Sequence, residues 1–226
     1  MLIDCHVHTS RYSPCSVLEP ASACRLAVQR GLAALVITEH QVQWTESELR
    51  ELQREFPDLI LYSGLEVTLA EGFDVVIITE ARGLTFPFGA PMAQVLDRLS
   101  AFREESFLFL AHAFRWTEKR SELMERVLDH MDGLEMNSVN IVGVRADRES
   151  GLYPPRLPEL YQTVQHERGL IPVYNSDAHS PQAVGSLASD IDGAAPPKGG
   201  AGLADLLKHS EPRQHQTAAL LRGLIA

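Results

Sequence analysis

The stretch LIDCHVH, residues 2–8, is a short apolar run that ends in two histidines separated by one residue. Its length and its branched residues predict a β-strand. Because residues i and i+2 of a strand point to the same face, His6 and His8 can reach one common point. A metal ion is the obvious occupant of that point, but a lone His-x-His pattern is weak evidence, so the rest of the chain must decide.

Six more apolar runs follow along the chain, and most are separated by segments with helical spacing. This alternation predicts either a β/α barrel or an open parallel sheet. In such folds the active site gathers at the carboxyl ends of the strands. The expected strands are residues 2–8, 32–38, 59–67, 73–79, 107–112, 133–137 and 170–177, and the expected helices are 20–30, 45–56, 92–105, 117–130 and 158–168.

Local signals support several of these boundaries. Gly31 is a natural stop for the first helix, and Thr45 with Glu48 makes a T-x-x-E capping box for the second. The Gly/Pro-rich segment 193–202 predicts a surface loop before a final helical stretch that reaches Ala226. Neither a repeat nor a shift in composition marks a boundary, so we expect a single domain over residues 1–226.

Composition excludes some functions. The 226 residues carry a net charge of −10, which argues against an extended nucleic-acid surface, since such a surface needs clustered lysine and arginine. The three cysteines are too few for a disulfide framework, and the start of the sequence lacks the pattern of a signal peptide. Without a membrane-spanning run, we expect a cytoplasmic location and no membrane partner.

Histidines and carboxylates recur where the predicted strands end. This combination of ligands suits zinc, manganese or iron. Four histidines, His130, His166, His209 and His215, lie in helical or terminal segments and are not candidates. The candidates at strand ends are His6, His8, His40, Glu66, His112, Asp177 and His179, together with Asp74 at the start of the fourth strand; Glu135 and Asn137 lie on the sixth.

Five segments, in chain order, resemble the motifs of the PHP family, the polymerase and histidinol phosphatase superfamily of metal-dependent phosphoesterases. The matches run from residue 4 to residue 185, and in this order they are highly specific. They are DCHVHTSRYSPCS (4–16), ITEH (37–40), SGLEVT (63–68), AHAFR (111–115) and NSDAHSPQAVG (175–185).

The resemblance implies a distorted seven-stranded (β/α)7 barrel and two or three divalent metal ions. On the family pattern, His6, His8, Glu66 and Asp177 would hold one ion. Glu66 would bridge to a second ion that His112 also holds, and His40 and His179 would belong to a third position.

This sequence departs from the family pattern at several positions. Asp74 stands where the second ion usually takes a histidine, and it is either an oxygen ligand or an ordinary exposed residue. Cys15 is the nearest candidate for a loop ligand of the third ion, and it is either a thiolate ligand, which favours zinc, or a plain loop cysteine. Glu39 replaces the usual aspartate and is expected to orient its neighbours, whereas Ala113 replaces a proline with little effect on chemistry.

The implied activity is hydrolysis of a small phosphorylated metabolite or short nucleotide by a metal-activated hydroxide. Arg115 lies three residues after His112, where its guanidinium can bind the phosphate or, alternatively, a nearby carboxylate. A third ion or His179 would stabilise the leaving group, which gives His179 a catalytic role. Arg11 is a weaker candidate for phosphate binding, and Trp44 and Trp116 either line the pocket or pack over the mouth of the barrel.

Two other functions stay open. The departures at positions 15, 39 and 74 are compatible with a degenerate metal-binding module that has a structural or partner-binding role. An amidohydrolase-like enzyme acting on C–N bonds fits the motif spacing less well and leaves Arg115 without a purpose. The sequence does not define the substrate, the number and identity of the metal ions, or the oligomeric state.

Overall fold

The computed structural model describes residues 1–142, 152–193 and 195–225, so Ala194 in the predicted loop and Ala226 at the end of the predicted helix lie outside it. The strands form two mixed sheets of five strands each. The first sheet has the order β10-β9-β1-β2-β3, and the second has the order β4-β5-β6-β7-β8. The strands are β1 (Leu2–Val7), β2 (Leu32–Ile37), β3 (Ile60–Ser63), β4 (Leu65–Thr68), β5 (Asp74–Thr79), β6 (Ser106–Ala111), β7 (Gly133–Asn137), β8 (Ile171–Tyr174), β9 (Leu187–Asp190) and β10 (Arg213–Gln216).

The prediction of a closed seven-stranded (β/α)7 barrel is wrong, because the described strands make two open sheets. The third predicted strand breaks at Gly64, so that β3 ends one sheet and β4 begins the other. A Cβ atom on Gly64 would lie 2.7 Å from the carbonyl oxygen of Ile77, which is why only glycine fits at this break. Two further strands, β9 and β10, extend the first sheet in antiparallel pairing from β1.

The direction of β5 also differs from a parallel barrel. β5 pairs antiparallel with both β4 and β6. The connection from β4 to β5 is a short turn around Gly72, whereas a parallel connection needs a crossover of about a dozen residues or more. Asp74 at the start of β5 therefore pairs with Thr68 and Ala111, which lie at the ends of β4 and β6.

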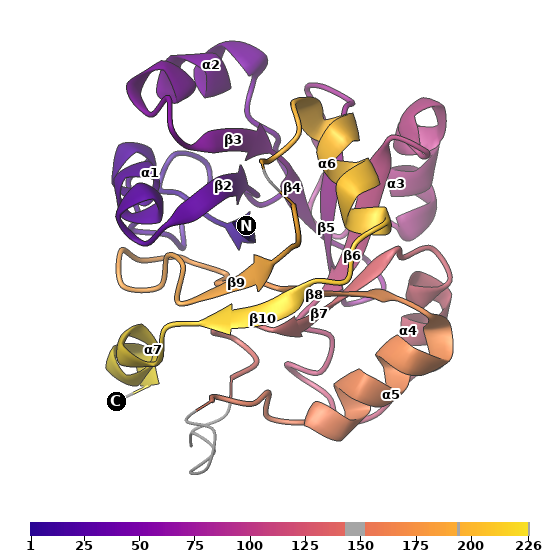
Figure 1. Ribbon diagram of the computed structural model, residues 1–226. Helices are drawn as coiled ribbons and strands as arrows, with labels where there is room; N and C mark the ends of the chain where they lie inside the picture. The colour runs from indigo at the N-terminus through magenta and orange to yellow at the C-terminus, as the bar shows by residue number, and fades with distance from the viewer. Residues whose placement is uncertain (143–151, 194, 226) are drawn as a thin grey trace.

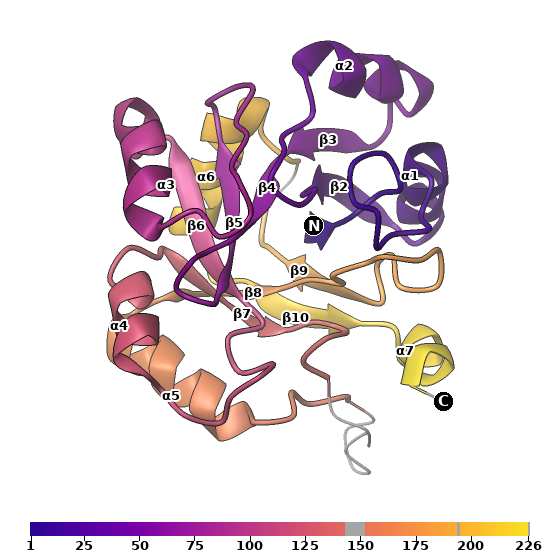
Figure 2. The same ribbon diagram turned by 180° about the vertical axis from the view of Figure 1, so that it is seen from behind.

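Seven α-helices flank the described sheets (Figures 1 and 2). The capping box of Thr45 and Glu48 forms as predicted, and Gly169 ends α5 in the left-handed conformation. The predicted C-terminal helix is instead α6, β10 and α7, because the polar strand RQHQ carries no apolar pattern to reveal it. The helices are α1 (Pro20–Gln29), α2 (Glu46–Glu55), α3 (Met92–Leu99), α4 (Glu122–Leu128), α5 (Pro158–Arg168), α6 (Gly199–Lys208) and α7 (Ala218–Ile225), and a 3-10 turn, η1 (Ser100–Phe102), follows α3.

The hydrophobic core has an inner layer between the two sheets and outer layers beneath the helices. Val36 from β2 and Phe109 from β6 belong to the inner layer, together with Leu203 of α6. Figure 1 looks onto α6, which crosses one end of the space between the sheets, and Figure 2 shows the molecule from behind. None of the helices in the described part of the chain combines the length and apolar character that crossing a bilayer requires.

Strand β1 changes face along its length. Ile3 and Cys5 pack in the inner layer, but Val7 packs in the outer layer with α1 and α2. The pairing of β1 with β2 shifts register between Asp4 and Val7, which accounts for the change. The shift turns the side chains of His6 and His8, which are both fully buried, toward the interior.

Candidate metal centre

Polar side chains from both sheets meet at the end of the sheets where β1, β2, β4 and β6 finish. His6 lies near the end of β1, Glu66 lies in β4, and His112 directly follows β6. Asp177 and its neighbours come from the loop after β8. The residues enclose a main cavity of about 400 Å³, whose walls include His40, Glu66, His112, Asp177 and His179.

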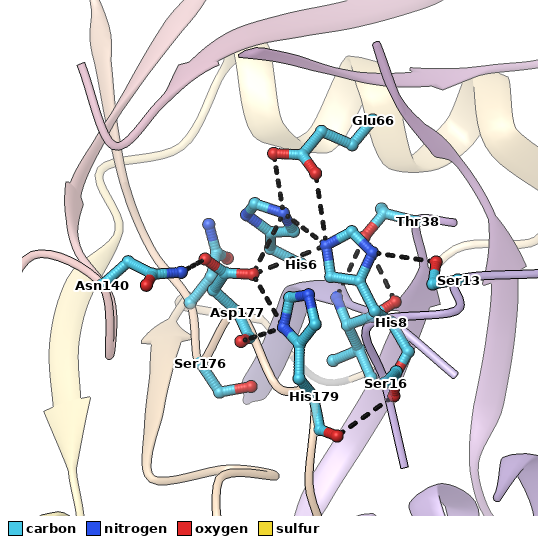
Figure 3. Close-up of polar contacts among 12 residues, drawn as sticks. His6, His8, Ser13, Ser16, Thr38, Glu66, Asn140, Ser176, Asp177 and His179 are labelled. Atoms are coloured by element: carbon cyan, nitrogen blue, oxygen red, sulfur yellow. Dashed lines mark hydrogen bonds and ion pairs between the residues drawn. The ribbon is translucent and has the colours of Figure 1, made fainter. Parts of the chain in front are cut away.

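The carboxylate of Glu66 is at the centre of this group and is 1% exposed. Its Oε1 lies 3.1 Å from Nε2 of His112 and 3.4 Å from Nε2 of His6. Its Oε2 lies 2.8 Å from Nδ1 of His40 and 3.4 Å from Nε2 of His8. Each oxygen therefore faces a different pair of histidines, which is the arrangement required of a carboxylate that bridges two metal ions. Figure 3 shows one histidine of each pair, His6 and His8, on the two oxygens of Glu66.

Asp177 is the second carboxylate of the group. Its Oδ1 lies 3.5 Å from Nε2 of both His6 and His8, and 3.5 Å from Nδ1 of His179. The Nδ2 amide of Asn140 donates a hydrogen bond to its other oxygen, as Figure 3 shows. Asp177 has a backbone φ of 50°, a left-handed conformation that is uncommon for residues other than glycine and that often marks functional sites.

Electrostatics couple the protonation of these groups. Burial alone would raise the pKa of the Glu66 carboxyl, but the charge of His6 and the hydrogen bond from His112 hold it well below its usual value. Burial disfavours the charged form of His6, yet the carboxylates around it, Asp177 foremost, raise its pKa well above the ordinary value. The pKa of His112 rises to about 9 against its burial because of Glu66, whereas burial lowers the pKa of His8 to about 4.

The donor set fits divalent metal ions. In the described residues, three groups each bring three ligand atoms within 4.8 Å of one another. Imidazole nitrogens mixed with carboxylate oxygens suit zinc, manganese and iron. The overlap of the groups places two or three candidate positions side by side. The groups are His6, His8 and Asp177; His6, Glu66 and His112; and His8, His40 and His179.

Glu135 in β7 is a supporting residue whose role the sequence did not reveal. It is fully buried, and its Oε1 lies 3.0 Å from Nδ1 of His6. The amide of Asn175 donates to the same oxygen, and the backbone N–H of His112 donates to Oε2. A carboxylate on Nδ1 of a histidine fixes the tautomer that leaves Nε2 free for a metal ion. The one sequence signal for this supporting role was a charged residue within the otherwise mostly apolar stretch GLEMN.

Other neighbours orient His8. Nδ1 of His8 lies 3.3 Å from the hydroxyl of Ser13, which itself donates to Glu39. Glu39 also accepts hydrogen bonds from the side chain of Thr9 and from the indole of Trp44. Glu39 therefore stabilises the loop after β1 and does not line the main cavity. Its carboxylate oxygens orient Thr9, Ser13 and Trp44 through these hydrogen bonds.

Asp74 and Cys15, the two departures from the family pattern that are candidate ligands, lie at the wall of the main cavity. Both are outside the three groups found in the described part of the chain. Oδ2 of Asp74 lies 3.8 Å from Nδ1 of His112, whose Nε2 faces Glu66. Asp74 thus approaches the opposite edge of that imidazole. Cys15 is exposed, and partial burial together with nearby carboxylates raises the pKa of its thiol.

The two predicted arginines differ in their surroundings. Arg115 lines the main cavity, and within residues 1–142, 152–193 and 195–225 no carboxylate lies within 4.0 Å of its guanidinium. Arg11 instead forms an exposed ion pair with Glu48 and stacks over Trp44. Trp44 is buried away from the cavity, whereas Trp116 is 81% exposed and lies beneath the guanidinium of Arg115.

Solved structures with the same fold are similar to nearly the whole chain. PsfC from Pseudomonas syringae is 18% identical with a TM-score of 0.64, over 98% of this chain and 93% of PsfC. A two-domain protein from Bacteroides vulgatus, which contains a predicted PHP-like metal-dependent phosphoesterase, is 17% identical with a TM-score of 0.67. That match covers 96% of this chain and 64% of the Bacteroides chain.

A third structure is that of a protein from Bifidobacterium adolescentis assigned as a metal-dependent phosphoesterase, with 16% identity and a TM-score of 0.56. The match covers 78% of this chain and 87% of that protein. No family model and no curated protein matches the sequence. At these identities the comparisons establish the fold, and the protein has the fold of PHP-like metal-dependent phosphoesterases, in agreement with the resemblance of its motifs.

Proposed function

We propose that the protein hydrolyses phosphate esters with the help of two or three divalent metal ions held around Glu66. The observation that carries the proposal is the placement of the two Glu66 oxygens against separate pairs of histidines. The proposed ligands are His6, His8, Glu66, His112, Asp177, His40 and His179, with Asp74 and Cys15 as further candidates at the cavity wall.

Bound divalent ions supply a water of lowered pKa and neutralise negative charge on the phosphate. The residues of the chain hold and orient the reactants. Glu135 keeps Nε2 of His6 directed inward, and the amide of Asn140 donates a hydrogen bond that orients the carboxylate of Asp177. Arg115 binds the non-bridging phosphate oxygens. Either a third ion or a hydrogen bond from the ring N–H of His179 stabilises the leaving oxygen.

The proposed substrate is a small phosphorylated metabolite or a short nucleotide. The main cavity of about 400 Å³ falls within the range of about 300–1,000 Å³ that is usual for small-molecule sites. The net charge of −10 disfavours binding of a long nucleic acid. The divalent ions and Arg115 supply positive charge only at the site itself, which is enough for a small anionic substrate. The three free cysteines favour a reducing compartment, so a cytoplasmic location is part of the proposal.

The test is release of the alcohol from p-nitrophenyl phosphate by protein supplied with zinc, manganese or iron. The variant His112→Ala should lose at least about 100-fold in kcat/KM, since it removes a proposed ligand. His209→Ala is the matched control, because His209 directly follows α6, is exposed and does not line the main cavity. Failure of every ion to support turnover, with no effect of His112→Ala, would refute the proposal.

A metal-binding module without catalysis is the second candidate. The position of Cys15 and Asp74 outside the three ligand groups favours it. This alternative expects bound metal and a lower melting temperature on chelation, with no hydrolysis of any ester. Parallel assays of metal content, thermal unfolding and turnover separate the two candidates.

A further inference from the structure

A second cavity adjoins the main one and shares two of its wall residues. This side cavity has a volume of about 250 Å³, and both Asp74 and His112 line it as well as the main cavity. Its remaining walls come from the turn between β4 and β5 and from the end of β6 and the segment after it; they are Gly72, Phe73, Ala111, Ala113, Trp116, Thr117 and Ser121. The two cavities therefore meet at Asp74 and His112.

Two aromatic side chains line the side cavity. Phe73 is partly buried and packs against the outer core, which anchors it. Trp116 is 81% exposed, although tryptophan is among the side chains that are highly buried on average. Flat aromatic surfaces of this kind bind other rings by offset stacking or edge-to-face contact.

Arg115 lines the main cavity and contacts Trp116, a wall residue of the side cavity. Its guanidinium carbon lies 4.7 Å from the ring centroid of Trp116, and the residue itself lines the main cavity. The guanidinium covers one face of the indole, and the large exposure of Trp116 leaves the other face open. A phosphate bound by Arg115 would thus lie within one small molecule's reach of the open indole face.

The two hydroxyls that line the side cavity are already engaged. The hydroxyl of Thr117 accepts a hydrogen bond from the backbone N–H of Lys119, and the hydroxyl of Ser121 caps α4 by accepting from Met124. At the edge shared with the main cavity, Oδ1 of Asp74 has no hydrogen-bond partner within the described residues. Away from Asp74 and His112 few donors or acceptors are left to select a ligand, so recognition there depends on stacking. The volume of about 250 Å³ is below the ~300 Å³ minimum usual for complete ligands, which suits one ring system rather than a whole molecule.

We infer that the side cavity binds a planar aromatic ring carried on the alcohol portion of the phosphate ester. The inference rests on the proposed phosphoesterase function and specifies its substrate class. The phosphate occupies the main cavity beside Arg115, the ester linkage passes His112, and the ring stacks on Trp116. Phosphate esters without a ring would lack the second set of contacts.

Two matched pairs of esters test the inference by isothermal titration of the protein as purified. One pair is AMP and ribose 5-phosphate, and the other is benzyl phosphate and cyclohexylmethyl phosphate. The aromatic member of each pair should bind about five- to 150-fold more tightly, as expected for one stacked base. A preference limited to AMP would define the ring as a nucleobase, and a preference in both pairs would extend it to aryl groups.

Substitutions localise the effect. Trp116→Ala should bring the affinity for AMP close to that for ribose 5-phosphate, while Trp116→Phe should retain most of the preference. Phe88→Ala is the matched control, because Phe88 is also 81% exposed but lines neither cavity. Thermal unfolding of each variant verifies that it folds.

The outcomes separate this inference from the proposed function. Equal affinity for both members of each pair, or a preference that survives Trp116→Ala, overturns the ring site even if both esters are hydrolysed. An aromatic preference that depends on Trp116, in a protein that hydrolyses neither ester, supports the ring site and contradicts the phosphoesterase proposal.

Discussion

Oε1 of Glu135 lies 3.0 Å from Nδ1 of His6, and both residues are completely buried. The same carboxylate accepts the backbone N–H of His112, so one side chain from β7 supports two proposed ligands that come from different sheets. The proposed metal centre therefore depends on a residue that is not itself a proposed ligand.

The variant Glu135→Gln should weaken metal binding by roughly 10- to 100-fold, the usual effect of losing such a support. An amide cannot offer acceptors on both of its ends, so contact with either His6 or His112 is lost. The measurement is competitive titration of chelator-stripped protein with zinc or manganese. Glu122→Gln on the exposed surface of α4 is the control. Unchanged affinity in Glu135→Gln would contradict the supporting role.

Arg115→Ala should lower kcat/KM for p-nitrophenyl phosphate by roughly 10- to 100-fold, since hydrogen bonds to charged groups contribute about 1.5–3 kcal/mol. Arg115→Lys should recover part of the loss, because lysine keeps the charge but not the planar fork. Steady-state kinetics provide the measurement, with Arg82→Ala as the control, since Arg82 pairs with Glu80 away from the cavities. Full activity of Arg115→Ala would exclude phosphate binding by this residue.

Gly64→Ala should destabilise the protein by roughly 1–3 kcal/mol, as overpacking of a closed site does. The added Cβ would meet the carbonyl oxygen of Ile77 at 2.7 Å and a methyl carbon of Val36 at 3.1 Å. Urea unfolding measures the change in free energy. Gly223→Ala in α7 is the control, because nothing lies within 4 Å of its added Cβ, and it should be neutral or stabilising. Equal stability of the two variants would argue against a tight break between β3 and β4.

Glu125 should contribute stability that disappears in acid. Hydrogen bonds from Arg120, and then from Arg168, lower the pKa of Glu125 from 4.5 to about 2. The contribution is thus complete above pH 4.5 and is lost as the pH falls toward 2. Because Glu125 and its two arginine partners are partly exposed, their ion pairs should contribute no more than about 1 kcal/mol to the free energy of unfolding.

Urea unfolding of wild type and Glu125→Gln tests this pH dependence. The difference in unfolding free energy should be largest near pH 6 and should shrink between pH 4.5 and 2. Glu118→Gln, at an exposed position before α4, controls for the loss of one surface charge. A difference that stays constant across this pH range would show that the ion pairs of Glu125 do not stabilise the fold.

The sequence predicted strands better than their assembly. Apolar runs revealed the segments that became β1 to β8, because a strand that is buried on both faces is a continuous run of apolar residues. The two-sheet arrangement depends on the close approach at Gly64 and on the polar strand β10, and neither of these produces an apolar run in the sequence. A barrel was therefore expected where two sheets occur.

The candidate site was predicted in position but not in its supports. Histidines and carboxylates at strand ends converge because the fold brings those ends together, and Asp74 joins them because β5 runs antiparallel to its neighbours. The hydrogen bond between Glu135 and His6 joins residues that are 129 positions apart, and no local sequence pattern predicts such a contact. The exposure of Trp116 beside a second cavity likewise emerges only in three dimensions.

The most direct test of the central claim is the metal-to-protein ratio, measured by elemental mass spectrometry on protein purified without chelators or a histidine tag. We expect two or three ions per chain in wild type and at most one in Glu66→Gln, because that variant removes the bridging carboxylate. A ratio of three would favour a third position at His40 and Cys15, and a ratio of two would exclude it. Protein without bound metal, or an unchanged ratio in Glu66→Gln, would contradict a metal centre built around Glu66.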